Sequence, residues 1–267
     1  MGKMRSETTP DSVEELAELL RENSVGQHTV ELGGNFTKRS MGGPILSPEV
    51  IVSTRRLDQI AAYEPKDLTV SVGAGMRFTD LVATLRANGQ ILPLDPPFST
   101  SATIGGVIAT NGSGPRRRRY GTGRDMVIGM TFVTVDGSVV QSGGMVVKNV
   151  TGLDMAKLMI GSFGTLAAIA TINFKIFPLP EMERTFVAIC ESLEPLLGLR
   201  NAILRSTLQP VAIDLLNTDA ARLVVPDLPY GHLLLTQVSG NARAMDRYHR
   251  EYEWFAKENK ASTFLTL

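Results

Sequence analysis

Residues 103–121, TIGGVIATNGSGPRRRRYG, place five glycines and four consecutive arginines in nineteen positions. Three roles are compatible with such a stretch: a patch that binds nucleic acid, a disordered linker, or a backbone surface that holds an anion. Glycine lets backbone N–H groups approach a ligand closely and permits positive φ. Consecutive N–H groups that converge on one concavity bind phosphate oxygens.

Composition weighs against nucleic acid. The 267-residue chain has no formal net charge, whereas proteins that bind nucleic acid usually carry a basic surplus. Its hydrophobic share of 43% is that of a folded protein with a substantial core. No apolar run is long enough to span a membrane, so we expect no direct membrane insertion. Cys190 is the only cysteine, which indicates a reducing, cytoplasmic location, with peripheral attachment to a membrane through partners left open.

The hydrophobic pattern predicts an α+β protein of two domains. An amphipathic helix over 10–24 is expected to begin at the N-cap Ser12. Strands and helices then alternate, with a hairpin whose turn contains Asp136 and Gly137 and a helix within 153–164. After Pro180 the order β-α-β-β-α-β is typical of a ferredoxin-like fold. We therefore expect a first domain over 1–180 and a second over 181–267, the latter a cap, substrate or partner domain.

Three glycine-rich segments, at 33–38, 103–114 and 161–165, share one character: a strand that runs into small residues. Any one of them could be an ordinary tight turn. Together, with hydroxyl groups at Thr37, Thr103 and Ser113, they favour an extended ligand that contains a diphosphate. A P-loop sequence is missing, and GAGMRF is only a fragment of G-x-G-x-x-G, so we expect no Rossmann site.

The order and spacing of several segments add a resemblance to a known family. These segments are ELGGNFTK (31–38), PLDPP (93–97), the run over 101–144, the run over 146–169, and FPLP (177–180). Over roughly residues 10–180 the chain resembles the FAD-binding domains of vanillyl-alcohol-oxidase type (PCMH-type) flavoproteins, and within them the FAD-binding subunits of bacterial glycolate oxidases. The resemblance implies a two-subdomain α+β cradle for FAD.

The resemblance also implies which residues hold FAD. The first loop would wrap the pyrophosphate, the second would follow the diphosphate, the ribityl chain and the flavin, and the third would add backbone contacts. The implied binding residues are Gly33, Gly34, Asn35, Phe36, Thr37, Lys38, Pro97, Thr103, Ile104, Gly105, Gly106, Asn111, Ser113, Gly114, Tyr120, Gly121, Asp125, Gly161, Gly164 and Ile169.

Two departures from the family pattern affect fine contacts beside the flavin and leave the fold expectation unchanged. Leu153 stands where a tyrosine is usual, and Ala167 stands where a glycine is usual. The histidines and the cysteine fall outside the loops in which a flavin would be tethered, so we expect non-covalent FAD. These residues are His28, His232, His249 and Cys190.

The four arginines at 116–119 have three open interpretations: a solvated loop tip, a clamp for a substrate carboxylate, for which a planar guanidinium is well shaped, or a docking site for an acidic partner. Arg124 and Lys148 are further clamp candidates. No catalytic base is identified. The chain also contains no H-x-G-D-G-N-x-H motif, the metal motif of related catalytic subunits, so we expect no metal.

The expected function is that of an FAD-binding subunit of a 2-hydroxy-acid dehydrogenase of the glycolate type. Its flavin would carry electrons in a complex with a second flavoprotein subunit and an iron–sulfur subunit. A self-sufficient FAD-dependent dehydrogenase of a small carboxylate is the alternative, and a flavin-free scaffold is the weaker one.

Overall fold

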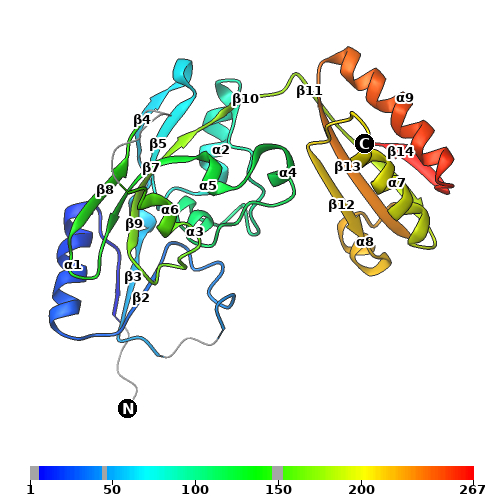
Figure 1. The fold of residues 1–267 in the computed structure, drawn as a ribbon. Coiled ribbons are helices and arrows are strands. Elements are labelled where there is room, and N and C mark those ends of the chain that lie inside the picture. The colour runs from blue at the N-terminus through cyan, green and yellow to red at the C-terminus, as the bar shows by residue number, and fades with distance from the viewer. Residues whose placement is uncertain (1–5, 44–46, 146–152) are drawn as a thin grey trace. The chain divides into compact units, whose positions relative to one another are not determined.

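The computed structural model describes residues 6–43, 47–145 and 153–267 (Figure 1). The chain forms two compact units. The first contains the residues up to Gly114 together with Gly121–Leu179, and the second contains Pro115–Tyr120 and Pro180–Leu267. The expected domain limits, 1–180 and 181–267, and the role of the second domain stay a prediction.

The first unit contains a small parallel sheet. Its strands are β1 (Ser6–Thr8), β3 (Val50–Ser53) and β2 (Val30–Gly33), in the order β1-β3-β2. Helix α1 (Val13–Val25) begins as predicted, because the Ser12 side chain accepts a hydrogen bond from the Glu15 backbone N–H at 3.1 Å. Leu16 and Leu20 of this helix are buried against Val52 and against Val133 and Ala170 of the second sheet.

That second sheet is antiparallel and has five strands in the order β4-β5-β9-β7-β8. They are β4 (Ile60–Glu64), β5 (Thr69–Gly73), β7 (Val127–Val133), β8 (Val139–Gly143) and β9 (Ala168–Lys175). The predicted hairpin is present between β7 and β8, with Gly137 at φ +79°. Two sheets of different type give the first unit the two-subdomain architecture expected from the sequence.

Short elements lie between these strands along the chain. The two 3₁₀ turns are η1 (Thr54–Arg56) and η2 (Pro65–Asp67). The helices are α2 (Phe78–Ala87), α3 (Ile104–Ala109), α5 (Gly123–Met126) and α6 (Ala156–Met159), and strand β6 (Gln90–Ile91) pairs with β10 (Phe177–Pro178). The structure differs from two local predictions. The helix expected within 153–164 is limited to α6, and the glycine-rich stretch after Thr103 forms α3, with the Thr103 side chain as its N-cap.

The second unit has the expected ferredoxin-like arrangement. Its four strands are antiparallel in the order β12-β13-β11-β14, which is the order of a split βαβ fold. The elements are α4 (Arg117–Tyr120), β11 (Met182–Cys190), α7 (Glu194–Arg205), β12 (Ala212–Leu216), α8 (Thr218–Val224), β13 (His232–Gly240), α9 (Ala242–Glu258) and β14 (Thr263–Thr266).

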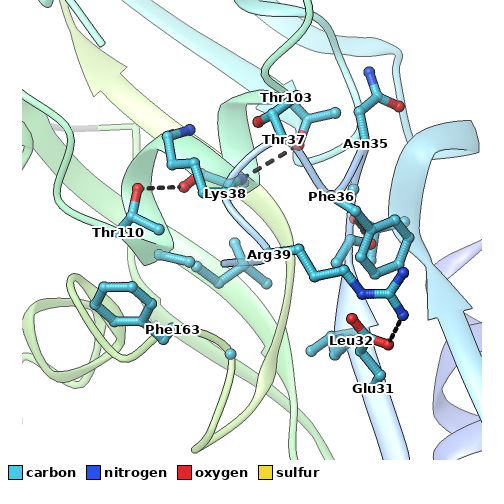
Figure 2. A pocket seen from close by; sticks show the side chains of 18 of the residues that line it. Glu31, Leu32, Asn35, Phe36, Thr37, Lys38, Arg39, Thr103, Thr110 and Phe163 are labelled. Atoms are coloured by element: carbon cyan, nitrogen blue, oxygen red, sulfur yellow. Dashed lines mark hydrogen bonds and ion pairs between the residues drawn. The ribbon is translucent and has the colours of Figure 1, made fainter. Parts of the chain in front are cut away.

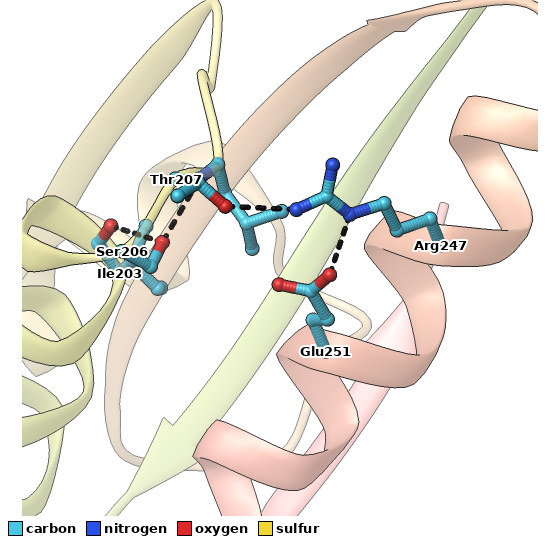
Figure 3. A network of polar contacts seen from close by, with 6 residues as sticks. Ile203, Ser206, Thr207, Arg247 and Glu251 are labelled. Atoms are coloured by element: carbon cyan, nitrogen blue, oxygen red, sulfur yellow. Dashed lines mark hydrogen bonds and ion pairs between the residues drawn. The ribbon is translucent and has the colours of Figure 1, made fainter.

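Helices α7 and α9 cover one face of this sheet. Leu199 and Ile203 of α7 and Tyr252 of α9 are buried in one cluster with Phe186 and Leu234 of the strands. A polar network joins α9 to the end of α7 (Figure 3): Arg247 donates to Thr207 Oγ1 at 2.8 Å and to Glu251 Oε1 at 2.6 Å.

Candidate functional site

A cavity of about 380 Å³ in the first unit brings the three glycine segments together (Figure 2). Strand β2 and the loop after it form one side, helix α3 forms another, and residues 163–169 complete the lining. Of the predicted binding residues, the lining contains Gly33, Gly34, Asn35, Phe36, Thr37, Lys38, Thr103, Gly105, Gly106, Gly164 and Ile169.

Close backbone contacts hold the first loop in place. A Cβ at Gly34 would lie 2.1 Å from Thr103 Oγ1, so this position requires glycine. The Ser53 hydroxyl donates to the Gly34 carbonyl at 2.9 Å, and the Asn35 side-chain amide donates to the Ser101 carbonyl at 2.8 Å. Phe36 adopts a left-handed backbone conformation, with φ +53°.

The same loop presents backbone donors that have no acceptor in the described parts of the chain. Within the described ranges, none of the backbone N–H groups from Asn35 to Lys38 donates a hydrogen bond. A left-handed residue next to right-handed or extended ones makes successive N–H groups converge, and such concavities bind phosphate oxygens. The loop over 35–38 therefore offers four neutral donors to an anion.

Lys38 adds a cation to these donors. Its ammonium nitrogen is buried and has no hydrogen-bond partner among the residues described, and burial lowers the pKa of Lys38. A buried ammonium without a counter-ion is unfavourable. A diphosphate in the cavity would supply the missing acceptors, so the residues present fit the anionic part of FAD.

Helix α3 contributes surface rather than donors. The N–H groups of Ile104 and Gly105 donate to the Met76 and Ala74 carbonyls at 2.8 and 2.7 Å, and the Gly106 N–H donates to Thr103 Oγ1 at 3.3 Å. These groups are thus engaged within the protein. The glycines of this helix let its backbone lie at the cavity wall, and a direct role of residues 103–106 toward a diphosphate stays a prediction.

The third segment is attached to the end of α3. Gly161, at φ +81°, donates its N–H to the Ile108 carbonyl at 3.1 Å, and the Phe163 N–H donates to the Ala109 carbonyl at 2.9 Å. Ser162 has a buried hydroxyl without a partner in the part of the chain described. The two hydrogen bonds from Gly161 and Phe163 therefore attach this segment to α3. Phe163, Gly164 and Ile169 of the segment line the cavity.

The remaining predicted residues do not line the cavity: Pro97, Ile104, Asn111, Ser113, Gly114, Tyr120, Gly121, Asp125 and Gly161. Several have visible structural roles. The Asp125 carboxylate accepts the Thr122 N–H at 2.8 Å, and this bond is the main cause of its lowered pKa. Gly121, at φ +84°, approaches that carboxylate closely. Contacts of these residues with a flavin stay predictions.

Several other sequence expectations can be located. Lys148 lies outside the described residues. Leu153 is exposed, whereas Ala167 is buried and lines the cavity. The lining contains neither Cys190 nor any of the three histidines.

Two charged residues of the lining, Glu31 and Arg39, were not among the predicted binding residues. Glu31, on β2, is 8% exposed, and one of its carboxylate oxygens forms an ion pair with Arg39. The Arg39 guanidinium also lies over the Phe36 ring, 5.6 Å from its centroid. Figure 2 shows this pair at the lower right of the cavity and the Lys38 ammonium at the upper left. A signal was available in the sequence, since two opposite charges flank the first glycine loop.

Comparison with known proteins assigns the first unit. Residues 7–143 match the family described as FAD binding domain. The chain belongs to this family of FAD-binding domains, and FAD is the cofactor that the family indicates.

Individual relatives extend the comparison. The chain is 26% identical over 264 residues to glycolate oxidase subunit GlcD of Bacillus subtilis, covering 96% of this chain and 56% of the relative. It is 36% identical over 148 residues to glycolate oxidase subunit GlcE of Escherichia coli, covering 55% and 42%. It is 30% identical over 228 residues to a D-lactate dehydrogenase of Anaerostipes hadrus, covering 82% and 46%. The chain thus spans about half the length of the curated relatives it matches.

Solved structures agree on the fold. A crystal structure of p-cresol methylhydroxylase with substrate bound superposes with a TM-score of 0.78 at 17% identity, covering 97% of this chain and 57% of that one. An alkyldihydroxyacetonephosphate synthase superposes with a TM-score of 0.81 at 18% identity, covering 97% and 51%. The described part of the chain contains no helix with the length and apolarity needed to cross a membrane.

Proposed function

We propose that this chain is the FAD-binding subunit of a dehydrogenase for small 2-hydroxy acids of the glycolate type. Its flavin would carry electrons within a complex that also contains a second flavoprotein subunit and an iron–sulfur subunit. The observation that carries the flavin site is the buried Lys38 ammonium, which has no partner in the described part of the chain, beside the N–H groups of residues 35–38, which donate to no described acceptor. The relatives named glycolate oxidase subunits support the substrate class and the complex.

Bound FAD would accept a hydride from the substrate carbon. The protein's own contribution to that site is binding and orientation. Lys38 and the loop over 35–38 would hold the diphosphate, and the α3 backbone at Gly105 and Gly106 would form part of the cavity wall. The titratable lining residues are Glu31, Lys38 and Arg39; two of them already form an ion pair, and we assign none of them as a catalytic base.

Flavin content and turnover test this proposal. The purified protein should contain one FAD per chain, and acid precipitation should leave that flavin in a yellow supernatant because the lining offers no histidine or cysteine for a covalent bond. With glycolate and a dye acceptor, the isolated protein should turn over slowly, and the complex captured from its native host should be far more active. Flavin that remains with the precipitate, or no flavin after reconstitution, would contradict the proposal.

The same turnover assay tests the alternative function, that of a self-sufficient dehydrogenase. The D-lactate dehydrogenase relative aligns with 82% of this chain, which favours a self-sufficient dehydrogenase as the second candidate. In that case the isolated protein should oxidise glycolate or D-lactate as fast as the captured complex does. Flavin content distinguishes both candidates from a scaffold without flavin.

The arginine run is proposed as the docking site for an acidic partner. Arg117, Arg118 and Arg119 are exposed on the single turn of α4, and like charges this close repel one another unless a partner neutralises them. Replacing these three with serine should slow complex formation several-fold at low ionic strength without changing flavin content, because the attraction is electrostatic and screened by salt. Association kinetics measured at two salt concentrations test this.

A charge-matched control separates docking from a general charge effect. Lys66, Arg86 and Arg243 are also exposed, and replacing them with serine removes the same charge from dispersed positions. If the control slows association equally, the run has no special role. If the arginine variant instead raises the KM of the isolated protein and leaves assembly intact, it clamps the substrate carboxylate.

A further inference from the structure

Glu31, a residue of the cavity lining, has one buried carboxylate oxygen without a hydrogen-bond partner among the described residues. The residue is 8% exposed, and Oε2 pairs with Arg39. Oε1 is buried and has no partner among the described residues. An unsatisfied buried carboxylate oxygen is costly to the free protein, and Glu31 lines the same cavity as Lys38. A bound molecule that brings a hydroxyl or amino hydrogen to Oε1 would remove that cost.

The cavity lining therefore contains two polar groups of opposite kind, a cation at Lys38 and a hydrogen-bond acceptor at Glu31. The Lys38 ammonium and Glu31 Oε1 have no partner among the described residues, and Figure 2 shows the two side chains at separate places in the lining. A ligand that satisfies both must carry an anionic group and, at some distance from it, a hydrogen-bond donor. A dinucleotide has this form, with a diphosphate at its centre and donors in both halves.

We propose that Glu31 recognises the adenosine half of FAD, accepting at Oε1 a hydrogen bond from a ribose hydroxyl or from the adenine amino group. This inference rests on the flavin site proposed above. The adenosine half fits Glu31 better than the flavin half because the ring system of the flavin gains electrons in the reaction, and a carboxylate beside it would oppose that gain. The adenosine half keeps its charge throughout.

Glu31→Gln is the sharpest variant because it preserves shape and changes the number of acceptors. The carboxylate has two acceptor oxygens, one for Arg39 and one for the ligand, whereas the amide has one oxygen and two N–H donors. At position 31 the amide must therefore point an N–H group either at the Arg39 guanidinium or at the ligand donor. In either orientation the ligand group loses its charged acceptor, because the amide is neutral and its one oxygen can serve only Arg39 or the ligand.

The experiment measures the affinity of the flavin-free protein for FAD, ADP, FMN and inorganic pyrophosphate by calorimetry. Glu31→Gln should weaken FAD and ADP about tenfold, the usual effect of losing a hydrogen bond to a charged group. FMN and pyrophosphate should bind as they do to the wild type. Glu18→Gln is the matched control, since Glu18 is exposed on α1, and it should leave all four affinities unchanged.

Two results would overturn the proposal: unchanged FAD affinity in Glu31→Gln, or FMN weakened as strongly as FAD, which would assign the oxygen to the flavin half. The outcome is distinguishable from failure of the proposed function, in which the wild type itself binds no FAD.

A second measurement needs no variant. The wild type should bind ADP about tenfold more tightly than one of two analogues: inosine diphosphate, which lacks the amino group, or 2′,3′-dideoxyadenosine diphosphate, which lacks both hydroxyls. The weaker analogue identifies the donor. If both analogues bind as tightly as ADP, Glu31 accepts no hydrogen bond from the adenosine half and the proposal is wrong. This result does not depend on whether the Glu31→Gln variant folds.

Discussion

Lys38→Met is expected to stabilise the flavin-free protein and to weaken its binding of FAD by about 100-fold or more, the scale on which buried charge partners contribute to binding. The two effects have one cause. The Lys38 ammonium is buried without a partner in the described structure, so it destabilises the free protein and becomes favourable only when an anion is present. Methionine keeps the length and flexibility of the side chain and removes the charge.

Thermal unfolding and a flavin titration measure the two effects on the same samples. The flavin-free variant should melt at a higher temperature than the wild type, and the FAD-loaded wild type should melt at a higher temperature than the variant given the same FAD. Lys66→Met, at an exposed position, is the control and should change neither value. A variant that binds FAD as tightly as the wild type would show that Lys38 faces no phosphate.

The pH dependence of stability tests independently whether the Lys38 ammonium destabilises the flavin-free protein. Burial lowers the pKa of Lys38 in the folded protein. Between this lowered value and the ordinary lysine pKa, the unfolded chain binds more protons at this residue than the folded chain does. Stability of the flavin-free wild type, relative to Lys38→Met, should therefore rise with pH across that window. A difference that stays constant up to strongly alkaline pH would mean that the ammonium is solvated.

The sequence was sufficient for the fold because its strongest signals are local. Alternating strands, the Ser12 cap and the Asp136–Gly137 turn each depend on a few neighbouring residues, and the βαββαβ order of the second unit follows from them. The three glycine segments could also be predicted from the sequence to be ligand loops, and that role stays a prediction. The structure adds that the first and third lie with α3 around one cavity.

What the sequence could not give depends on contacts between distant segments. Glu31 occupies one position in a strand of alternating polarity, and only the turn at Phe36, which returns Arg39 over it, shows that its carboxylate is buried. Similarly, adjacent glycines suggest a turn after Thr103. Helix α3 forms there because Gly105 fits closely against the Ala74 backbone and Thr103 caps the first turn.

Gly106→Val is expected to abolish FAD binding while leaving a folded protein. A Cβ at Gly106 would lie 3.3 Å from Thr103 Oγ1, a tight contact that a small shift of this hydroxyl relieves, and would meet no other described atom within 4 Å outside the backbone of its own helix. Gly106 also lines the cavity, and the branched side chain would occupy space that the ligand needs. Valine is tolerated in a short helix, so the expected loss is one of binding and not of stability.

The neighbouring glycine behaves differently in the structure from what its sequence position suggests. From the sequence alone, Gly105→Val and Gly106→Val are expected to act alike. A Cβ at Gly105, however, would lie 2.8 Å from Ala74 Cβ and 3.0 Å from the Ala74 carbonyl oxygen. Gly105→Val should therefore disturb the packing of α3 on the segment after β5, and lose both flavin and thermal stability.

Flavin content and circular dichroism of the purified variants separate these two effects. Gly144→Val serves as the control, because nothing lies within 4 Å of a Cβ built there and the residue is not part of the cavity lining; it should retain both flavin and fold. We expect Gly106→Val to have the dichroism of the wild type and no bound flavin. If it retains wild-type flavin occupancy, the wall of the cavity at α3 does not face the cofactor. The diphosphate must then be held from the side of β2 alone, by Lys38 and the N–H groups that precede it.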